Sequence, residues 1–535
     1  MAIMATVMVK IIKKRTGLPK PFALICPWLL AFSSFAGEWQ FTPTVGIEET
    51  YTDNVELKID DQISSFVSQA ILGLGVDYTS QNAQFSFKGD NSYVFYSHDS
   101  ELNDDYLALD TNGSLNFWDN GPILIASASI RNVSRNTADN SLADLVSGDT
   151  IQAEYYSTGL TYDTGNSDYI VSSSLILNRT QYEDEIGDYD GITATIDAIN
   201  GNAARNVFWS INGLYNERDN ATTSGTYYSV EAKFGAITSY KLNPFIRYFD
   251  EDVTGTAFGT EQVASRSWGP GIRWKASEHL YIDVSYNYVA DKTKSDDYVE
   301  TNINWQPSQR TSLVAGFNQR FFGDSYNLDF SHRTKRLTNR ITYHEVIELY
   351  DRNSFREVEL GEYWCPIGGP FDESACFPES MPPSDTTGYI LVPLNSLIPV
   401  EDNEFYLNSN LAWNTNLSLS RTRFTFIISS REREGLENGI VDEHFDVNFS
   451  GSRTLTPRSE FSVALSYREN TYDKYFSPTE ARQEDVYRTI TATYSKDLAH
   501  SLSSYFTLQH VNRESNVERY AYDEVRAVAN ITKEF

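Results

Sequence analysis

The stretch that decides the fold is FSVALSY at residues 461–467, in which apolar and small polar side chains alternate one by one. The segments FTFII at residues 424–428 and YIDVSYNY at residues 281–288 repeat the pattern. A period of two places successive side chains on opposite faces of a β-strand, so each segment has one apolar face. A soluble β-sandwich would show the same alternation, and the pattern alone leaves a sandwich and a membrane barrel open.

The lengths of the connections favour the barrel. Tight turns such as DNG at residues 119–121 and LTPR at 455–458 follow every second strand, whereas longer acidic connections at 52–63, 136–148 and 471–482 follow many of the others. Outer-membrane barrels have short periplasmic turns and long extracellular loops. We therefore predict an all-β protein, a transmembrane antiparallel up-and-down β-barrel of about 24 strands within a range of 18–26.

The first 36 residues have the pattern of an export signal. Basic residues in 10–20 precede an apolar run at 21–33, and Ser34-Phe35-Ala36 offers small residues at a cleavage site. We predict cleavage between Ala36 and Gly37, which leaves residues 37–535 as one barrel. An uncleaved membrane anchor is the alternative, but the run is short and holds two prolines.

Composition and charge exclude several classes of protein. After the signal the chain has no apolar stretch of the ~18 residues that a spanning helix needs, and its mean hydropathy is −0.42. The aromatic content of 14% suits a barrel with aromatic girdles. The net charge of −30, which falls to −35 without residues 1–36, excludes nucleic acid as a partner. The acidic loops fit either a surface that faces lipopolysaccharide and its divalent cations or simply solvated charge.

The chain ends on Phe535, in an alternating segment that starts at Val525. A terminal aromatic residue that closes such a strand resembles the signal read by the barrel assembly machinery, although Lys533 stands where that signal usually has an apolar residue. We therefore expect the outer membrane of a Gram-negative bacterium as the location. The expected partners are outer-membrane lipid, lipopolysaccharide and the assembly machinery.

Residues that could carry catalysis are scattered. The seven histidines form no pair with serine or glutamate at a catalytic spacing, and no phosphate-binding glycine loop, zinc-type cysteine spacing or calcium loop occurs. We therefore expect no catalytic residues, no metal, no cofactor and no enzymatic activity.

Arginines alternate with the apolar face of the segment 421–433 and should point into the lumen. Arginines in three other segments alternate with apolar side chains in the same way and should also point into the lumen. The predicted lumen-facing set is Arg421, Arg423, Arg431, Arg433, Arg320, Arg333 and Arg340. Such side chains could select an anionic solute, as rings of arginine do in anion pores. The alternative is that they pair with lumen acids such as Asp329, Asp446 and Glu460 and only fill the barrel.

After cleavage two cysteines remain, Cys365 and Cys376, both in the long segment 353–402. The compartment is oxidising and only one pairing within the chain exists, so we predict a disulfide. A barrel of this size leaks unless something fills it. We therefore predict that residues 353–402 fold inward as a constriction; an external cap or receptor-binding lobe is the alternative.

Five motifs carry a family resemblance: GPGIRW at 269–274, PSQRT at 307–311, RFFGDSYNL at 320–328, SHRT at 331–334 and YTDNV at 51–55. Over nearly the whole mature chain the sequence resembles outer-membrane barrels encoded with PEP-CTERM/exosortase systems and exopolysaccharide biosynthesis clusters of Gram-negative bacteria. The resemblance implies a role in exopolysaccharide production or export and supplies no binding or catalytic residues.

We therefore expect a channel or assembly component linked to exopolysaccharide export, with an anionic polysaccharide and periplasmic export components as further partners. A non-transporting structural or adhesive surface barrel is the second reading, and an outer-membrane hydrolase the third.

Overall fold

The computed structural model describes residues 37–137, 144–147, 149–220, 224–255, 263–290, 296–349, 354–367, 376–380, 382–383, 386–400, 405–436, 439–472 and 482–535. The predicted export signal, residues 1–36, lies outside the described residues. No helix in the described part of the chain is long and apolar enough to cross a membrane.

Nearly all of the described chain is β-strand. The first strands are β1 (Gly37–Thr52), β2 (Ser65–Ser80), β3 (Ala83–Tyr96), β4 (Asp104–Asn116), β5 (Ile123–Ser134), β6 (Thr150–Gly165), β7 (Tyr169–Tyr182), β8 (Tyr189–Asn200), β9 (Val207–Asp219), β10 (Ser224–Ala236), β11 (Leu242–Gly255) and β12 (Val263–Ser277). The next are β13 (Leu280–Val289), β14 (Tyr298–Ser308), β15 (Thr311–Arg320), β16 (Gly323–Arg333), β17 (Leu337–Leu349), β18 (Ser354–Pro366), β19 (Phe377–Pro378) and β20 (Tyr389–Val400). The last are β21 (Phe405–Ser418), β22 (Thr422–Gly435), β23 (Val441–Thr456), β24 (Ser459–Tyr472), β25 (Gln483–Ala499), β26 (Leu502–Ser515) and β27 (Tyr522–Glu534), and two short 3₁₀ turns lie at Ser100–Leu102 and Glu518–Tyr520.

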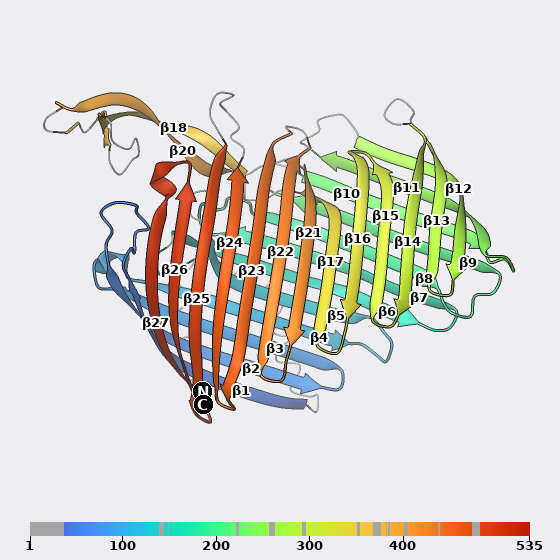
Figure 1. Cartoon of the computed structure of the whole chain (residues 1–535), viewed down its shortest axis with the longest axis horizontal. Coiled ribbons are helices and arrows are strands. Elements are labelled where there is room, and N and C mark those ends of the chain that lie inside the picture. Colours follow the sequence, from blue (N-terminus) through green and yellow to red (C-terminus); the bar gives the residue numbers. More distant parts are fainter. Residues whose placement is uncertain are drawn as a thin grey trace.

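Twenty-four of these strands form one closed antiparallel sheet. Each strand pairs with the next along the chain, β17 pairs with β21, and β27 pairs with β1 over residues 526–534 and 44–52. Figure 1 shows the steep strands β21–β27 in front and the strands β1–β8 crossing behind them at a large angle, as the tilted strands of a barrel do. The predicted up-and-down barrel of about 24 strands is confirmed.

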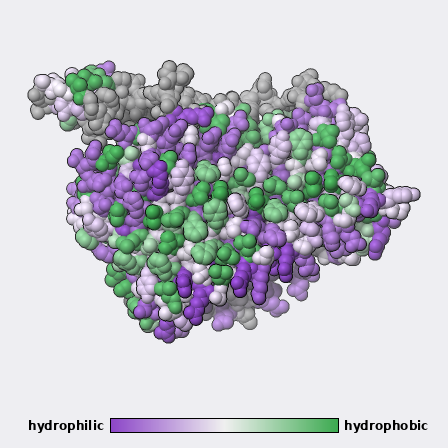
Figure 2. Space-filling model, viewed as in Figure 1, coloured by the Kyte–Doolittle hydropathy of each residue, from purple (hydrophilic) through white to green (hydrophobic). Residues whose placement is uncertain are grey.

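The two faces of the sheet differ in chemistry. Along β11, Leu242, Ile246 and Tyr248 are exposed on one face, whereas Asn243 and Arg247 are buried on the other. The other strands repeat this alternation with exposed Phe, Trp, Ile and Leu. In Figure 2 the hydrophobic residues gather across the middle of the surface, and hydrophilic ones are more frequent toward its ends. This is the distribution that a barrel surface in contact with lipid requires, so the polar face lines a lumen.

The strands β18 and β20 lie outside the barrel. They pair with each other and with β19 in a separate three-stranded sheet. A disulfide joins Cys365 and Cys376, the two cysteines that the sequence analysis paired. Figure 1 shows this sheet above one end of the barrel, extending past its outline. The expected inward fold of residues 353–402 is therefore not found in the described part, because β18 and β20 satisfy each other's backbone hydrogen bonds away from the wall.

The first prediction concerns orientation. The long connections and the β18–β20 sheet lie at one end of the barrel, and both termini lie at the other (Figure 1). On intact cells a membrane-impermeant maleimide should label D60C, in the exposed β1–β2 connection, but neither D119C nor R458C in exposed short turns. Cys365 and Cys376 are joined to each other and do not react, and Cys26 lies in the export signal that we expect to be removed. Labelling of D119C and R458C, with D60C protected, would reverse the orientation.

Candidate functional site

The lumen is the candidate site, and its tightest part lies on β10–β14. Lys233 Nζ of β10 donates to Glu300 Oε1 of β14 over 2.9 Å and lies 3.8 Å from Asp283 Oδ2 of β13. Four strand steps separate β10 from β14, which is about 19 Å along an unbent sheet. The wall must therefore curve sharply, so that side chains of both strands meet across a narrow part of the lumen.

Further ion pairs fill this narrow part. Arg247 Nε donates to Glu231 Oε1 over 2.5 Å, and one of its terminal nitrogens donates to the Tyr298 hydroxyl over 3.1 Å. Arg273 donates to both carboxylate oxygens of Asp283 over 2.7 and 2.8 Å. Each of these buried cations has a carboxylate partner, which offsets the cost of taking the charge out of water. This end of the lumen is therefore packed with paired charges.

Two of the predicted arginines also pair with acids. Arg320 forms an ion pair with Glu251 and donates to the Tyr227 hydroxyl over 2.7 Å. Arg340 forms an ion pair with Asp329 over 2.7 Å. Arg320 and Arg340 therefore pair with acidic side chains, which is the alternative to a role in selecting anions.

The arginines of β22 differ among themselves. Arg433 is buried, with its guanidinium 3.5 Å from the centre of the Tyr406 ring and 3.5 Å from Asp442 Oδ2. Arg423 and Arg431 lie on the same face, are exposed, and make no ion pair with a described residue. These two side chains keep their charge available to a solute in the lumen.

The other two predicted arginines lie at the ends of strands. Arg421 is exposed in the turn before β22, and Arg333 is exposed at the last position of β16. Neither makes an ion pair with a described residue. Both therefore stand at the end of the barrel that carries the short turns rather than deep in the lumen.

A hydrophobic cluster narrows the lumen near the end of the barrel that carries β18 and β20. It consists of the buried side chains of Tyr227, Val253, Ile347, Leu349 and Phe405, which come from β10, β11, β17 and β21. Arg218 of β9 donates a hydrogen bond to the carbonyl oxygen of Leu349. The hairpin β15–β16 is short, so β17 and β21 extend beyond it and lean against β9–β11.

The β5–β6 connection, not the β17–β21 segment, enters the lumen. Its described part is residues 144–147. Val146 packs in a buried cluster with Val55, Val67 and Val94, of which the last two lie on the lumen faces of β2 and β3. The Tyr96 hydroxyl donates to the Leu145 carbonyl over 2.6 Å. Residues 145 and 146 of this connection therefore lie against the lumen faces of β2 and β3.

Ionic side chains on β27 fasten this loop. Arg526 forms an ion pair with Asp144, and its Nε donates to Glu524 Oε1 over 2.6 Å. Glu524 Oε1 also accepts hydrogen bonds from Ser147 over 3.1 Å and from Thr52 over 2.6 Å. We call Asp144, Ser147, Glu524 and Arg526 the loop latch. It ties the β5–β6 connection to the last strand of the barrel, with β1–β4 in between.

The loop latch was not predicted from the sequence, because the constriction was assigned to the longest connection, residues 353–402. A signal was present: Leu145 and Val146 are apolar residues in a polar connection, next to Asp144. A second signal was the pair Glu524 and Arg526, two ionisable residues on the polar face of one strand. A charged side chain that is buried inside a barrel needs a hydrogen-bonding or ionic partner, and here Asp144 and Ser147 of the loop provide it.

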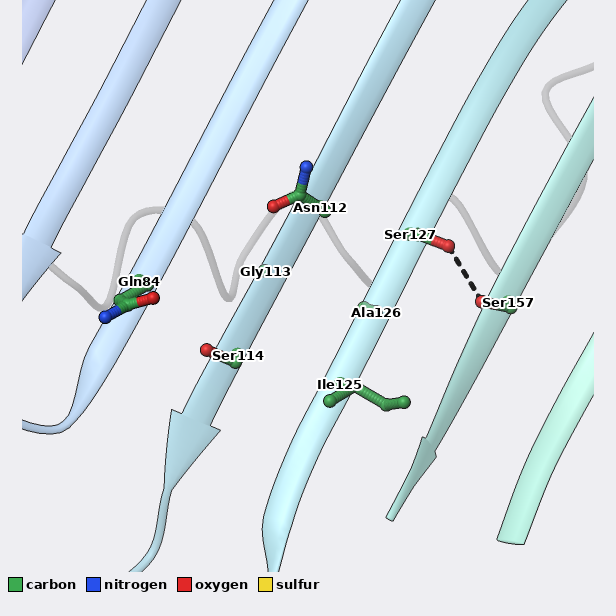
Figure 3. Close-up of a pocket in the computed structure, with 8 residues that line it drawn as sticks. All are labelled: Gln84, Asn112, Gly113, Ser114, Ile125, Ala126, Ser127 and Ser157. Carbon is green, nitrogen blue, oxygen red and sulfur yellow. Dashed lines mark hydrogen bonds between the residues drawn. The ribbon is translucent and has the colours of Figure 1, made fainter. Parts of the chain in front are cut away.

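One part of the lumen wall between these places is hydrophilic and uncharged. Figure 3 shows an open depression of about 270 Å³ on β3–β6, lined by Gln84, Asn112, Gly113, Ser114, Ile125, Ala126, Ser127 and Ser157. The hydroxyl groups of Ser127 on β5 and Ser157 on the neighbouring β6 are hydrogen-bonded, with 2.8 Å between their oxygen atoms. The described residues contain no group of three or more His, Cys, Asp or Glu side chains that could hold a metal ion. This part of the wall thus offers hydrogen-bonding groups to a solute.

These features decide the class of the protein. The chain folds as an outer-membrane β-barrel. No family model and no curated protein matches its sequence.

Similar solved structures include the siderophore receptor PirA from Acinetobacter baumannii, with 9% identity over 93% of this chain and 80% of that one, at a TM-score of 0.45. The FrpB iron transporter from Neisseria meningitidis has 10% identity over 92% and 81%, at 0.42. Pseudomonas aeruginosa OpdK, solved with vanillate, has 6% identity over 93% and 99%, at 0.36. At these TM-scores we draw the function from the lumen and not from the neighbours.

The second prediction concerns the loop latch. R526Q removes one partner of a buried ion pair, which costs about 3–5 kcal/mol and should release the loop from the lumen. We expect a larger single-channel conductance in planar bilayers. The matched control is R488Q, which breaks an exposed Arg–Glu pair with Glu514 on the outer face of β25 and β26 and should leave conductance unchanged. Equal conductance in R526Q and the wild-type protein would contradict a loop that narrows the lumen.

Proposed function

We propose that this protein is an outer-membrane channel through which an extracellular polysaccharide leaves the cell. The observation that carries the proposal is the chemistry of the accessible wall on β21–β26. Its lumen-facing side chains are mostly neutral amides and hydroxyls: Asn410, Asn414, Asn416, Thr425, Asn448, Ser450, Ser466, Thr489, Thr491, Thr493, Thr507 and Gln509.

Such a wall suits a chain of sugars. Amide and hydroxyl groups exchange hydrogen bonds with sugar hydroxyls in place of water, and each exchange contributes little net free energy. Passage needs sites that bind well enough to admit the solute but weakly enough to release it. Many equivalent weak partners, such as Asn416 with Thr425 at 2.9 Å and Thr493 with Thr507 at 2.9 Å, meet both needs.

Two further features support the proposal. The resemblance to barrels of exopolysaccharide clusters points to the same class of solute. Arg423 and Arg431, which form no ion pair with a described residue, add positive charge to the wall of β22, which favours polymers that carry anionic groups.

The third prediction tests this charge. In a planar bilayer with a salt gradient, the double variant R423Q/R431Q should shift the reversal potential toward cation preference, because it removes positive charge from the lumen. R453Q is the control: Arg453 is exposed near the end of β23 on the face opposite the lumen, and its loss should not change selectivity. Unchanged selectivity in a conducting R423Q/R431Q pore would leave the two arginines without a role in the passage of ions.

A second candidate is a structural or adhesive surface barrel. The sheet of β18, β19 and β20 favours it, since this sheet projects above the barrel and is braced by the disulfide Cys365–Cys376 (Figure 1). An exposed, covalently braced sheet is a suitable platform for contact with other molecules outside the cell.

The fourth prediction separates the two candidates. If the protein is a channel, deleting its gene should stop secretion of the polymer while synthesis continues, and a copy that lacks residues 354–400 should restore secretion. Secretion is measured as polymer in the medium against polymer in the cell. A surface barrel predicts normal secretion without the gene, with loss of cell attachment that the shortened copy does not repair.

A further inference from the structure

Five lumen-facing side chains form a row across β5–β9. They are Arg131, Tyr155, Tyr182, Tyr189 and Arg218, one from each strand in order, and all are at least partly accessible. We call this row the tyrosine–arginine track. Its members lie on the face opposite the exposed Leu160, Leu175, Leu177, Ile196 and Ile211, which contact lipid.

Contacts join Arg131 to Tyr155, Tyr155 to Tyr182, and Tyr189 to Arg218. The Arg131 guanidinium lies 4.3 Å from the centre of the Tyr155 ring. The rings of Tyr155 and Tyr182 meet edge to face with centres 6.3 Å apart, and the Arg218 guanidinium lies 4.5 Å from the Tyr189 ring. In the register of the sheet Thr180 of β7 lies between Tyr155 and Tyr189, and Tyr182 lies two residues further along the same face of β7.

The track occupies the gap between the two narrow places of the lumen. On one side the β5–β6 loop lies against β2 and β3. On the other side the hydrophobic cluster joins β10 and β11 to β17 and β21, and Arg218 itself contacts Leu349 of β17. A solute that passes between these two places can therefore contact the lumen face of β5–β9.

The track differs from the packed charges elsewhere in the lumen. Lys233, Arg247 and Arg320 are buried against carboxylates. Arg131 is exposed and makes no ion pair with a described residue; its contact is the face of Tyr155. A cation stacked on an aromatic ring keeps its N–H groups directed outward along the ring edge, where they can reach an anion. Arg131 on the Tyr155 ring is therefore placed for contact with a solute.

We propose that the tyrosine–arginine track binds a sugar chain that carries carboxylate groups. Aromatic rings offer a flat apolar surface to the C–H face of a sugar ring, and guanidinium groups bind carboxylates through paired hydrogen bonds. Four strand steps make the row about 19 Å long, which accommodates several sugar units. On neighbouring strands Asp90 and Asp110 face the lumen and repel the same carboxylates, which confines the chain to the track. The proposal rests on the proposed function and names its substrate class.

The fifth prediction uses the purified full-length protein and two probes, an oligouronate and an uncharged oligoglucose of equal length. Binding is measured by calorimetry and by block of the single-channel current. The wild-type protein should bind the oligouronate more tightly. Y155A/Y182A should weaken binding of both probes by about threefold to tenfold through the lost ring contacts, and R131Q should weaken only the oligouronate.

Two controls make the result decisive. K88Q removes a lumen-facing cation of β3 outside the track and should leave both affinities unchanged. Y155F keeps the ring and should bind both probes as the wild-type protein does. A folding defect would appear in any variant as loss of the heat-dependent shift in electrophoretic mobility that a folded barrel shows. Equal affinity for both probes, or track variants that behave like K88Q, would overturn the proposal.

The two proposals can fail separately. If gene deletion stops secretion of the polymer but the track variants bind the oligouronate normally, the proposed function stands and the track proposal falls. If the track variants lose oligouronate binding but secretion is normal without the gene, the track proposal stands as a binding site and the export function falls.

Discussion

In lipid every backbone N–H and C=O group must find a partner within the protein, and this constraint determines the rest of the structure. The pairing of residues 44–52 in β1 with 526–534 in β27 meets it by removing the last free edges. Once the sheet is closed, the period of two assigns each side chain either to lipid or to the lumen. The hydrophilic wall, the buried ion pairs and the tyrosine–arginine track all follow from which side chains that assignment turns inward.

Most of the fold could be predicted because its signals are local. The segments that alternation predicts lie on barrel strands, for example 421–433 against β22 at Thr422–Gly435. Alternation also places Arg423, Arg431 and Arg433 on one face of β22. It does not give depth or partners: Arg423 and Arg433 share a face, but Arg433 is buried on Tyr406 because β21 and β23 supply an aromatic ring and Asp442 at that height. Those neighbours depend on the closed shape, which no local pattern encodes.

The loops could not be assigned from sequence for the same reason. Length singled out residues 353–402 as the filler, yet the described part of that segment pairs with itself. The loop that enters the lumen is fastened by Ser147 and Glu524, which are 377 positions apart. The tyrosine–arginine track also draws one residue from each of five strands, so its composition becomes visible only when the strands lie side by side.

The loop latch has a consequence for the order in which the barrel forms. Its anchoring side chains, Glu524 and Arg526, belong to the last strand, whereas Asp144 and Ser147 are synthesised early. Residues 145 and 146 can contact β2 and β3 earlier, but the loop latch cannot form until β27 is in place, so the loop is fastened only when the barrel closes. Formation of the loop latch is therefore a mark of completed insertion: a chain that stops short of β27 leaves an open seam and an unfastened loop together.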